Sequence, residues 1–217
     1  MNNATFIQKF IKDLEIEKNR FSSLKIAIND ARKLTGRNIV SGDSELNILA
    51  NTNDFLSPDS FICIINYLLI LDLIGEVFNV KGFTTKKNNN IYKALKQFSS
   101  LTSEKDIDTI IALRNSLAHN YGLINIPRDE KENSTKRHKF ILLHYENSFL
   151  IKYPTTIWNG DFKDKSEDTS TQISKINLIN LIEQTYKNLV KESENNRIEL
   201  NLSGGVEELK SRFTLIF

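Results

Sequence analysis

Apolar residues recur at helical spacing through the first half of the chain. Two such stripes lie within the first 35 residues, and Gly36 ends the second of them. The next helix is expected at about 58–78, where Ser57-Pro58-Asp59 supplies an N-cap, a proline at the first helical position and an early acid. Because this segment is apolar almost all round, we expect it to be a central helix of a bundle.

Two further helices are expected after a polar loop, a short one at about 91–99 and a longer one at 104–120. Thr102 or Ser103 is placed to cap the longer helix. Its apolar residues recur at helical spacing, and five of them define the predicted buried stripe: Ile107, Ile110, Ile111, Leu117 and Ala118.

Arg114 falls in the middle of that stripe on a helical wheel. An arginine stays protonated, and burying it without a partner is costly. Asp72 interrupts the apolar helix at 58–78 in the same way, so we predict either a structural ion pair between Arg114 and Asp72 or an Asp72 that orients Arg114 toward a phosphate. Glu76, one turn after Asp72, is a second candidate partner.

The periodicity changes after Pro127 and the charged run 128–139. Segments 139–145 and 149–153 predict a β-hairpin, and a third strand is expected near 170–176. Helical spacing then returns at about 177–193 and, after two glycines, at 206–213.

The predicted fold is therefore mainly α, an up-and-down helical bundle with a small antiparallel β-hairpin insertion at about 137–176. One domain over 1–217 is expected, since 217 residues suffice for a single core.

Composition excludes several classes of protein. The net charge is only +2, so contacts with nucleic acid would need locally concentrated charge. The single cysteine, Cys63, excludes an internal disulfide and a cysteine-based zinc cluster, and we expect it to be a buried thiol in a reducing compartment.

No signal peptide is evident, and the apolar run 61–80 is interrupted by polar residues, so we expect a cytoplasmic protein without a membrane span. No metal-ligand spacing or glycine-rich phosphate loop is present, so neither a metal nor a cofactor is expected.

The segment from Arg114 to Leu123 carries the candidate chemistry. A permanent cation, Arg114, lies five residues before His119, and Tyr121 follows two residues later. His119 is placed at a helix end, where an imidazole can gain and lose a proton near neutral pH. Asn115, one turn before His119, is expected to hydrogen-bond the imidazole or a substrate phosphate. The alternative is structural, with Arg114 paired to an acid and His119 capping the helix.

This Arg-x4-His-x-Tyr pattern resembles the HEPN superfamily of helical domains, and in particular the HEPN toxins that pair with small nucleotidyltransferases. The resemblance implies a homodimer in which the two motif helices face each other and form one composite cleft. It implies that Arg114 and Asn115 grip the scissile phosphate of an RNA and that His119 transfers protons. We expect Asp72, Tyr121 and Asn120 to support this site. Tyr121 occupies the position that the partner nucleotidyltransferase, the antitoxin, adenylylates. The predicted hairpin is a departure from the minimal bundle.

The expected function is a metal-independent endoribonuclease of a bacterial phage-defence or toxin–antitoxin system, which cleaves RNA by attack of the 2′-hydroxyl. One alternative is a non-catalytic HEPN-like module that binds nucleotide, RNA or a protein partner, and another is an unrelated bundle whose hairpin mediates assembly. The basic cluster around His138 is expected to be a solvated strand start or a contact to phosphate backbone.

Overall fold

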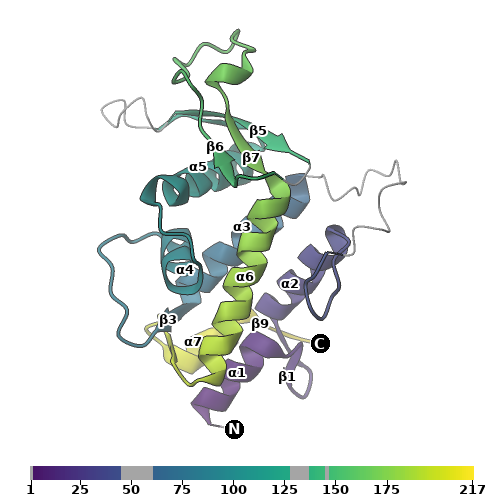
Figure 1. The fold of residues 1–217 in the computed structure, drawn as a ribbon. Coiled ribbons are helices and arrows are strands. Elements are labelled where there is room, and N and C mark those ends of the chain that lie inside the picture. The colour runs from purple at the N-terminus through teal and green to yellow at the C-terminus, as the bar shows by residue number, and fades with distance from the viewer. Residues whose placement is uncertain (1, 45–60, 128–136, 145–146) are drawn as a thin grey trace. The chain divides into compact units, whose positions relative to one another are not determined.

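The computed structural model describes residues 2–44, 61–127, 137–144 and 147–217, and helices account for about 51% of these residues. Seven α-helices and nine short strands lie in these described ranges (Figure 1). The predominance of helix with small sheets is as predicted. The chain forms two compact units, Met1–Ser100 with Ile182–Phe217, and Leu101–Leu181.

The first unit is built from five helices and the greater part of a sixth. These are α1 (Asn3–Lys12), α2 (Ser23–Leu34), α3 (Phe61–Val77), α4 (Asn90–Phe98), α7 (Gly205–Phe213) and the segment of α6 (Lys175–Glu194) that begins at Ile182. Side chains cap three of them, because Asn2, Ser22 and Asn89 each accept a hydrogen bond from a backbone N–H in the first turn. Helix α3 packs against both α2 and α4 and buries Tyr67, Leu71 and Ile74 completely, as its apolar pattern predicts. Its predicted capping segment, 57–59, lies outside the described residues.

Three-residue strands join the helices of this unit, and none of them was predicted. Strands β1 (Glu15–Glu17) and β2 (Arg20–Ser22) form a hairpin between α1 and α2, and β9 (Thr214–Ile216) pairs antiparallel with β2. Strands β3 (Phe78–Val80) and β8 (Ile198–Leu200) pair antiparallel. A strand of three residues is too short to display an alternating pattern, so the sequence gives no local signal for it.

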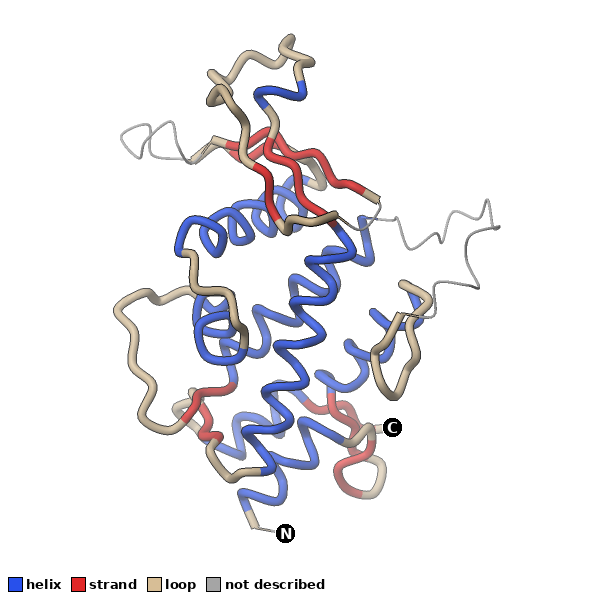
Figure 2. The backbone as a smooth tube through the Cα atoms, in the orientation of Figure 1, coloured by secondary structure: helices blue, strands red, loops and turns tan. Residues whose placement is uncertain are grey.

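The second unit contains α5 (Glu104–Asn120), the first residues of α6, and a four-stranded sheet. The strands are β4 (Ile124–Asn125), β5 (His138–Leu143), β6 (Ile151–Lys152) and β7 (Thr171–Ser174), and a 3₁₀ turn at Glu167–Thr169 precedes β7. Figure 2 shows these strands in red.

The predicted hairpin is wrong in its pairing. The described sheet has the order β4-β5-β7-β6, so β7 lies between the two strands that were expected to pair. It runs parallel to β5 and antiparallel to β6. The buried residue Ile173 faces Leu142 on one side and Ile151 on the other. A central strand of this kind pairs on both edges. Its partners are determined by tertiary packing, whereas a hairpin pairs two strands that one turn connects.

Cys63 is buried in α3, as expected, with its Sγ 3.4 Å from the Leu34 carbonyl oxygen. No helix within the described ranges is both long and apolar enough to cross a membrane.

Candidate functional site

Helix α5 extends over the predicted residues, but its buried face is rotated from the predicted one. Leu113 is completely buried, whereas Ala118 is exposed and Ile111 is only half-buried. Arg114 is therefore half-buried at the border of the apolar face and not in its middle. The prediction gave Ala118 too much weight, because an alanine gains little from burial and does not determine which face a helix buries.

The first turn of α5 is fixed within its unit by Tyr153. Ser103 caps the helix and accepts a hydrogen bond from the Asp106 N–H at 3.2 Å. The Tyr153 hydroxyl donates to Asp106 Oδ1 at 2.6 Å, and the Lys105 ammonium lies 3.5 Å from the centre of the Tyr153 ring. Burial, followed by the hydrogen bond to Asp106, raises the pKa of Tyr153, so this phenol remains a donor. These contacts hold α5 against the segment that contains β6.

The last turns of α5 bring the predicted residues Arg114, Asn115 and His119 together. Arg114 Nη1 lies 3.2 Å from His119 Nε2 and 3.3 Å from Asn115 Oδ1. A guanidinium can only donate, so a hydrogen bond between these two atoms requires the Nδ1–H tautomer of His119, in which Nε2 accepts. His119 is exposed, and Arg114 and Asn115 are half-buried. Because Arg114 Nη1 contacts His119 Nε2, the histidine is not isolated from the arginine. The structural alternative, in which Arg114 pairs with an acid and His119 caps the helix, stays a prediction.

Tyr121 follows the helix in a left-handed backbone conformation, with φ 50° and ψ 35°. Its backbone N–H donates to the Leu117 carbonyl at 3.1 Å, and the Gly122 N–H donates to the Ser116 carbonyl at 3.3 Å. The Tyr121 side chain is 62% exposed, so it is not a core residue. Asn120 ends the helix, and its side chain lies outside the part of the structure that is described.

Two predicted partners of Arg114 lie on α3, in the other unit. Asp72 is half-buried there, and its pairing with Arg114 stays a prediction. Glu76 forms an ion pair with Arg212 of α7, within its own unit. We therefore retain only Asp72 as a predicted partner.

His138 itself is buried, so this residue is neither solvated nor open to a phosphate backbone. The two roles expected for the basic cluster around it stay predictions. His138 Nδ1 lies 3.0 Å from Thr171 Oγ1, and its ring stacks on Phe140 with centroids 5.1 Å apart. Burial, and then the Lys105 charge, lower the pKa of His138 to about 4. His138 is therefore a neutral packing residue of the sheet. The third histidine, His144, is exposed, with Nδ1 2.5 Å from Lys175 Nζ.

We expect the stability of the second unit to fall as the pH decreases from 6.5 to 4. The unfolded imidazole binds a proton below about 6.5, whereas the folded one resists protonation until about 4, so the full stabilisation is present above pH 6.5. Its complete loss corresponds to about 3 kcal/mol. Urea unfolding of wild type and His138→Gln across this range measures it. The difference in unfolding free energy between them should shrink by that amount toward low pH, while exposed His144→Gln should parallel wild type. A constant difference would contradict a depressed pKa.

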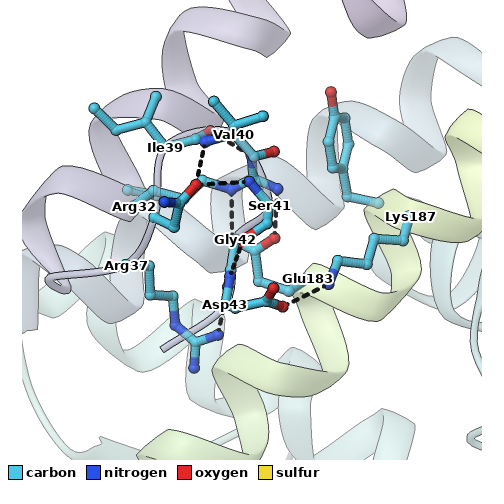
Figure 3. A network of polar contacts seen from close by, with 12 residues as sticks. Arg32, Arg37, Ile39, Val40, Ser41, Gly42, Asp43, Glu183 and Lys187 are labelled. Carbon is cyan, nitrogen blue, oxygen red and sulfur yellow. Dashed lines mark hydrogen bonds and ion pairs between the residues drawn. The ribbon is translucent and has the colours of Figure 1, made fainter. Parts of the chain in front are cut away.

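The sequence reasoning missed a buried ion pair in the first unit, shown in Figure 3. Arg32 on α2 and Glu183 on α6 are almost fully buried, and the guanidinium binds the carboxylate through Nε at 3.0 Å and Nη2 at 2.8 Å. The Tyr67 hydroxyl donates to the same carboxylate at 2.8 Å. Arg32 Nη1 donates to the carbonyl oxygens of Ile39 and Val40. The one available signal was the position of Arg32 four residues after Ile28, on the apolar stripe.

The loop that follows α2 closes over this ion pair. Gly42 has φ +74°, and a Cβ there would lie 2.3 Å from Glu183 Oε2. Arg37 Nη1 donates to the Gly42 carbonyl at 2.9 Å, and Lys187 binds Asp43 at 3.0 Å (Figure 3). Because Arg32 already makes four hydrogen bonds to protein groups, we interpret this network as structural rather than as a ligand site.

Within the described residues, no group of three or more histidine, cysteine, aspartate or glutamate side chains is placed to hold a metal ion. Comparison of the chain with protein-family models, with curated proteins and with solved structures gives no significant match in any of the three. The resemblance to the HEPN superfamily therefore rests on the residues Arg114, Asn115, His119 and Tyr121 alone.

Proposed function

We propose that the C-terminal end of α5 is the catalytic site of a metal-independent endoribonuclease of the HEPN type. The observation that carries this proposal is the contact between Arg114 Nη1 and Nε2 of an exposed His119, at 3.2 Å. This pair presents a permanent cation and a base at one surface. A phosphodiester needs the cation for its charge, and a neighbouring hydroxyl needs the base for its proton.

RNA supplies its own nucleophile, so the site needs no metal-bound water. A phosphate that binds the Arg114 guanidinium replaces His119 as its acceptor and leaves Nε2 able to take the proton of the 2′-hydroxyl. The 2′-oxygen then bonds to phosphorus, the bond from phosphorus to the 5′-oxygen breaks, and that oxygen takes a proton from an acid. The products are a 2′,3′-cyclic phosphate and a 5′-hydroxyl. Asn115 Oδ1, which contacts Arg114 Nη1 at 3.3 Å, orients the guanidinium during this step.

One histidine cannot be base and acid in the same instant, so a second copy of the site completes the reaction. The resemblance supplies it, because HEPN domains pair their motif helices across a homodimer. By the same resemblance, the fold is a HEPN-like bundle and Tyr121 accepts a nucleotide from a nucleotidyltransferase antitoxin. The proposal also includes a cytoplasmic location and support of the site by Asp72 and Asn120. A phosphate group on Tyr121 would place negative charge beside Arg114 and block RNA.

We expect the wild-type protein to cleave total RNA in the presence of EDTA and to leave 2′,3′-cyclic phosphate ends. His119→Ala should lower the cleavage rate by about 10²–10⁴-fold, the usual contribution of a general acid or base. Its folding free energy should change by only about 1 kcal/mol, since His119 is an exposed residue at a helix end. His144→Ala removes an exposed histidine of the same unit and should keep the activity, which makes it the matched control. Circular dichroism checks that each variant is folded.

The active preparation should be a dimer, with about twice the 25.0 kDa mass of the chain by light scattering. Cleavage that EDTA abolishes and magnesium restores would contradict the metal-free mechanism. Binding of RNA without cleavage would instead favour the non-catalytic module. Full activity of a strict monomer would remove the composite site.

A further inference from the structure

Tyr121 has an unusual backbone for its residue type. Three residues other than glycine have positive φ in the described ranges, and the other two, Asn19 and Asn196, are asparagines. Asparagine enters the left-handed region readily, whereas a residue with a bulky side chain seldom does. The left-handed residue after a helix is usually a glycine, so a glycine would have suited position 121. A conformation that disfavours its own side chain points to a use for that side chain.

The Tyr121 side chain is also the most exposed of the described tyrosines. It is 62% exposed, whereas Tyr67, Tyr92 and Tyr186 are buried and Tyr153 is half-buried. Each buried tyrosine packs in the core of the first unit. The Tyr121 ring therefore contributes little to the packing of the free protein.

The backbone of Tyr121 is nevertheless well fixed. The hydrogen bonds to the Leu117 and Ser116 carbonyls hold it in the helix cap, two residues after His119. An aromatic side chain on a fixed backbone has only two rotatable bonds to order when a flat ligand stacks on it, so it loses little entropy. Nucleobases are such ligands, and stacking on an aromatic side chain accepts any base because every base has a π face.

We infer that Tyr121 is a base-stacking residue, which receives the base of a nucleotide next to the scissile phosphate. This inference rests on the proposed ribonuclease function and specifies what that site selects. Bases in a duplex are already stacked on their neighbours and are not available to the ring. The site therefore selects nucleotides whose bases are unstacked, in single strands or loops, and Tyr121 determines this preference.

The test uses a twelve-nucleotide RNA of mixed sequence, either single-stranded or annealed to its complement, and a 2′-O-methyl version that cannot be cleaved. Tyr121→Phe keeps the ring and should therefore lose far less than a variant without a ring in kcat/KM and affinity for the single strand. Tyr121→Leu keeps apolar bulk without a ring. It should lose about 5- to 150-fold in kcat/KM for the single strand and in affinity for the uncleavable strand, which corresponds to one lost stacking contact. On the duplex, all three proteins should have equally low kcat/KM and affinity.

An abasic nucleotide placed at each position of the strand in turn separates stacking from a structural role. At the stacking position it should lower wild-type affinity and kcat/KM to the level of Tyr121→Leu and should leave the values of Tyr121→Leu unchanged.

Four outcomes would contradict these proposals. If wild type cleaves RNA and Tyr121→Leu keeps the same kcat/KM and affinity, the stacking inference is overturned and the ribonuclease function stands. Equal losses in Tyr121→Phe and Tyr121→Leu would assign the role to the hydroxyl and also overturn it. If wild type binds the uncleavable strand but cleaves no RNA, the proposed ribonuclease function is overturned. The affinities of wild type, Tyr121→Phe and Tyr121→Leu for that strand then still test the stacking inference. Wild type that neither binds nor cleaves would overturn both.

Discussion

Glu183→Ala is expected to lower the free energy of unfolding by about 3–5 kcal/mol, because it leaves the buried Arg32 charge without its counter-ion. Arg32 is only 1% exposed, so water cannot replace the carboxylate. The substitution also removes the acceptor of the buried Tyr67 hydroxyl. Chemical denaturation followed by circular dichroism measures the loss.

A matched control is available on the same helix. Glu194 pairs with Lys12, and both side chains are about half exposed, so Glu194→Ala should cost less than about 1 kcal/mol. The double variant Arg32→Met, Glu183→Leu removes both charges and should recover much of the stability lost by Glu183→Ala. Some loss should remain, since the carbonyls of Ile39 and Val40 lose their donor. Equal losses in Glu183→Ala and Glu194→Ala would show that burial of the pair has no energetic consequence.

Gly75→Ala should destabilise the first unit although alanine is the better helix former. A Cβ at Gly75 would lie 1.8 Å from the Asn90 carbonyl oxygen, at the point where α4 begins. That oxygen belongs to the backbone, so relief requires α3 and α4 to move apart. Overpacking of this kind costs typically about 1–3 kcal/mol, and more when backbone must shift. The gain in helix propensity is about 1 kcal/mol. We therefore expect a clear decrease in Tm.

Gly82→Ala is the comparison for this substitution. No atom lies within 4 Å of its Cβ position, so it introduces the same methyl group without a clash, although φ +82° disfavours alanine there. Its effect should be limited to that conformational preference, about 1 kcal/mol. A Gly75→Ala protein as stable as wild type would mean that α3 and α4 approach less closely than described.

The helices were predictable because each repeats its own local pattern. The segment 104–120 was predicted to the residue, since Ser103 caps its start and Gly122 follows its end. The expected helix at 91–99 was found one residue earlier, as α4. These signals depend on neighbours three or four residues away, which the sequence displays directly.

Strand pairing was not predictable in the same way. The strand near 170–176 was expected, but its place between β5 and β6 was not. Alternation tells which face of a strand is buried and does not tell which strand lies beside it. The short strands of the first unit pair residues as distant as Arg20 and Ile216, and no local pattern connects them.

For the candidate site, the sequence by itself determined which residues meet. Arg114, Asn115 and His119 lie within two turns of one helix, so helical geometry alone brings them together. Only the tertiary structure decided how deeply each is buried, because burial depends on what packs against the helix. In the tertiary structure His119 and Tyr121 are exposed, Arg114 is half-buried and His138 is buried. It also decided which charges are paired, since Arg32 and Glu183 are 151 residues apart in the chain and only the packing of α2 against α6 makes them neighbours.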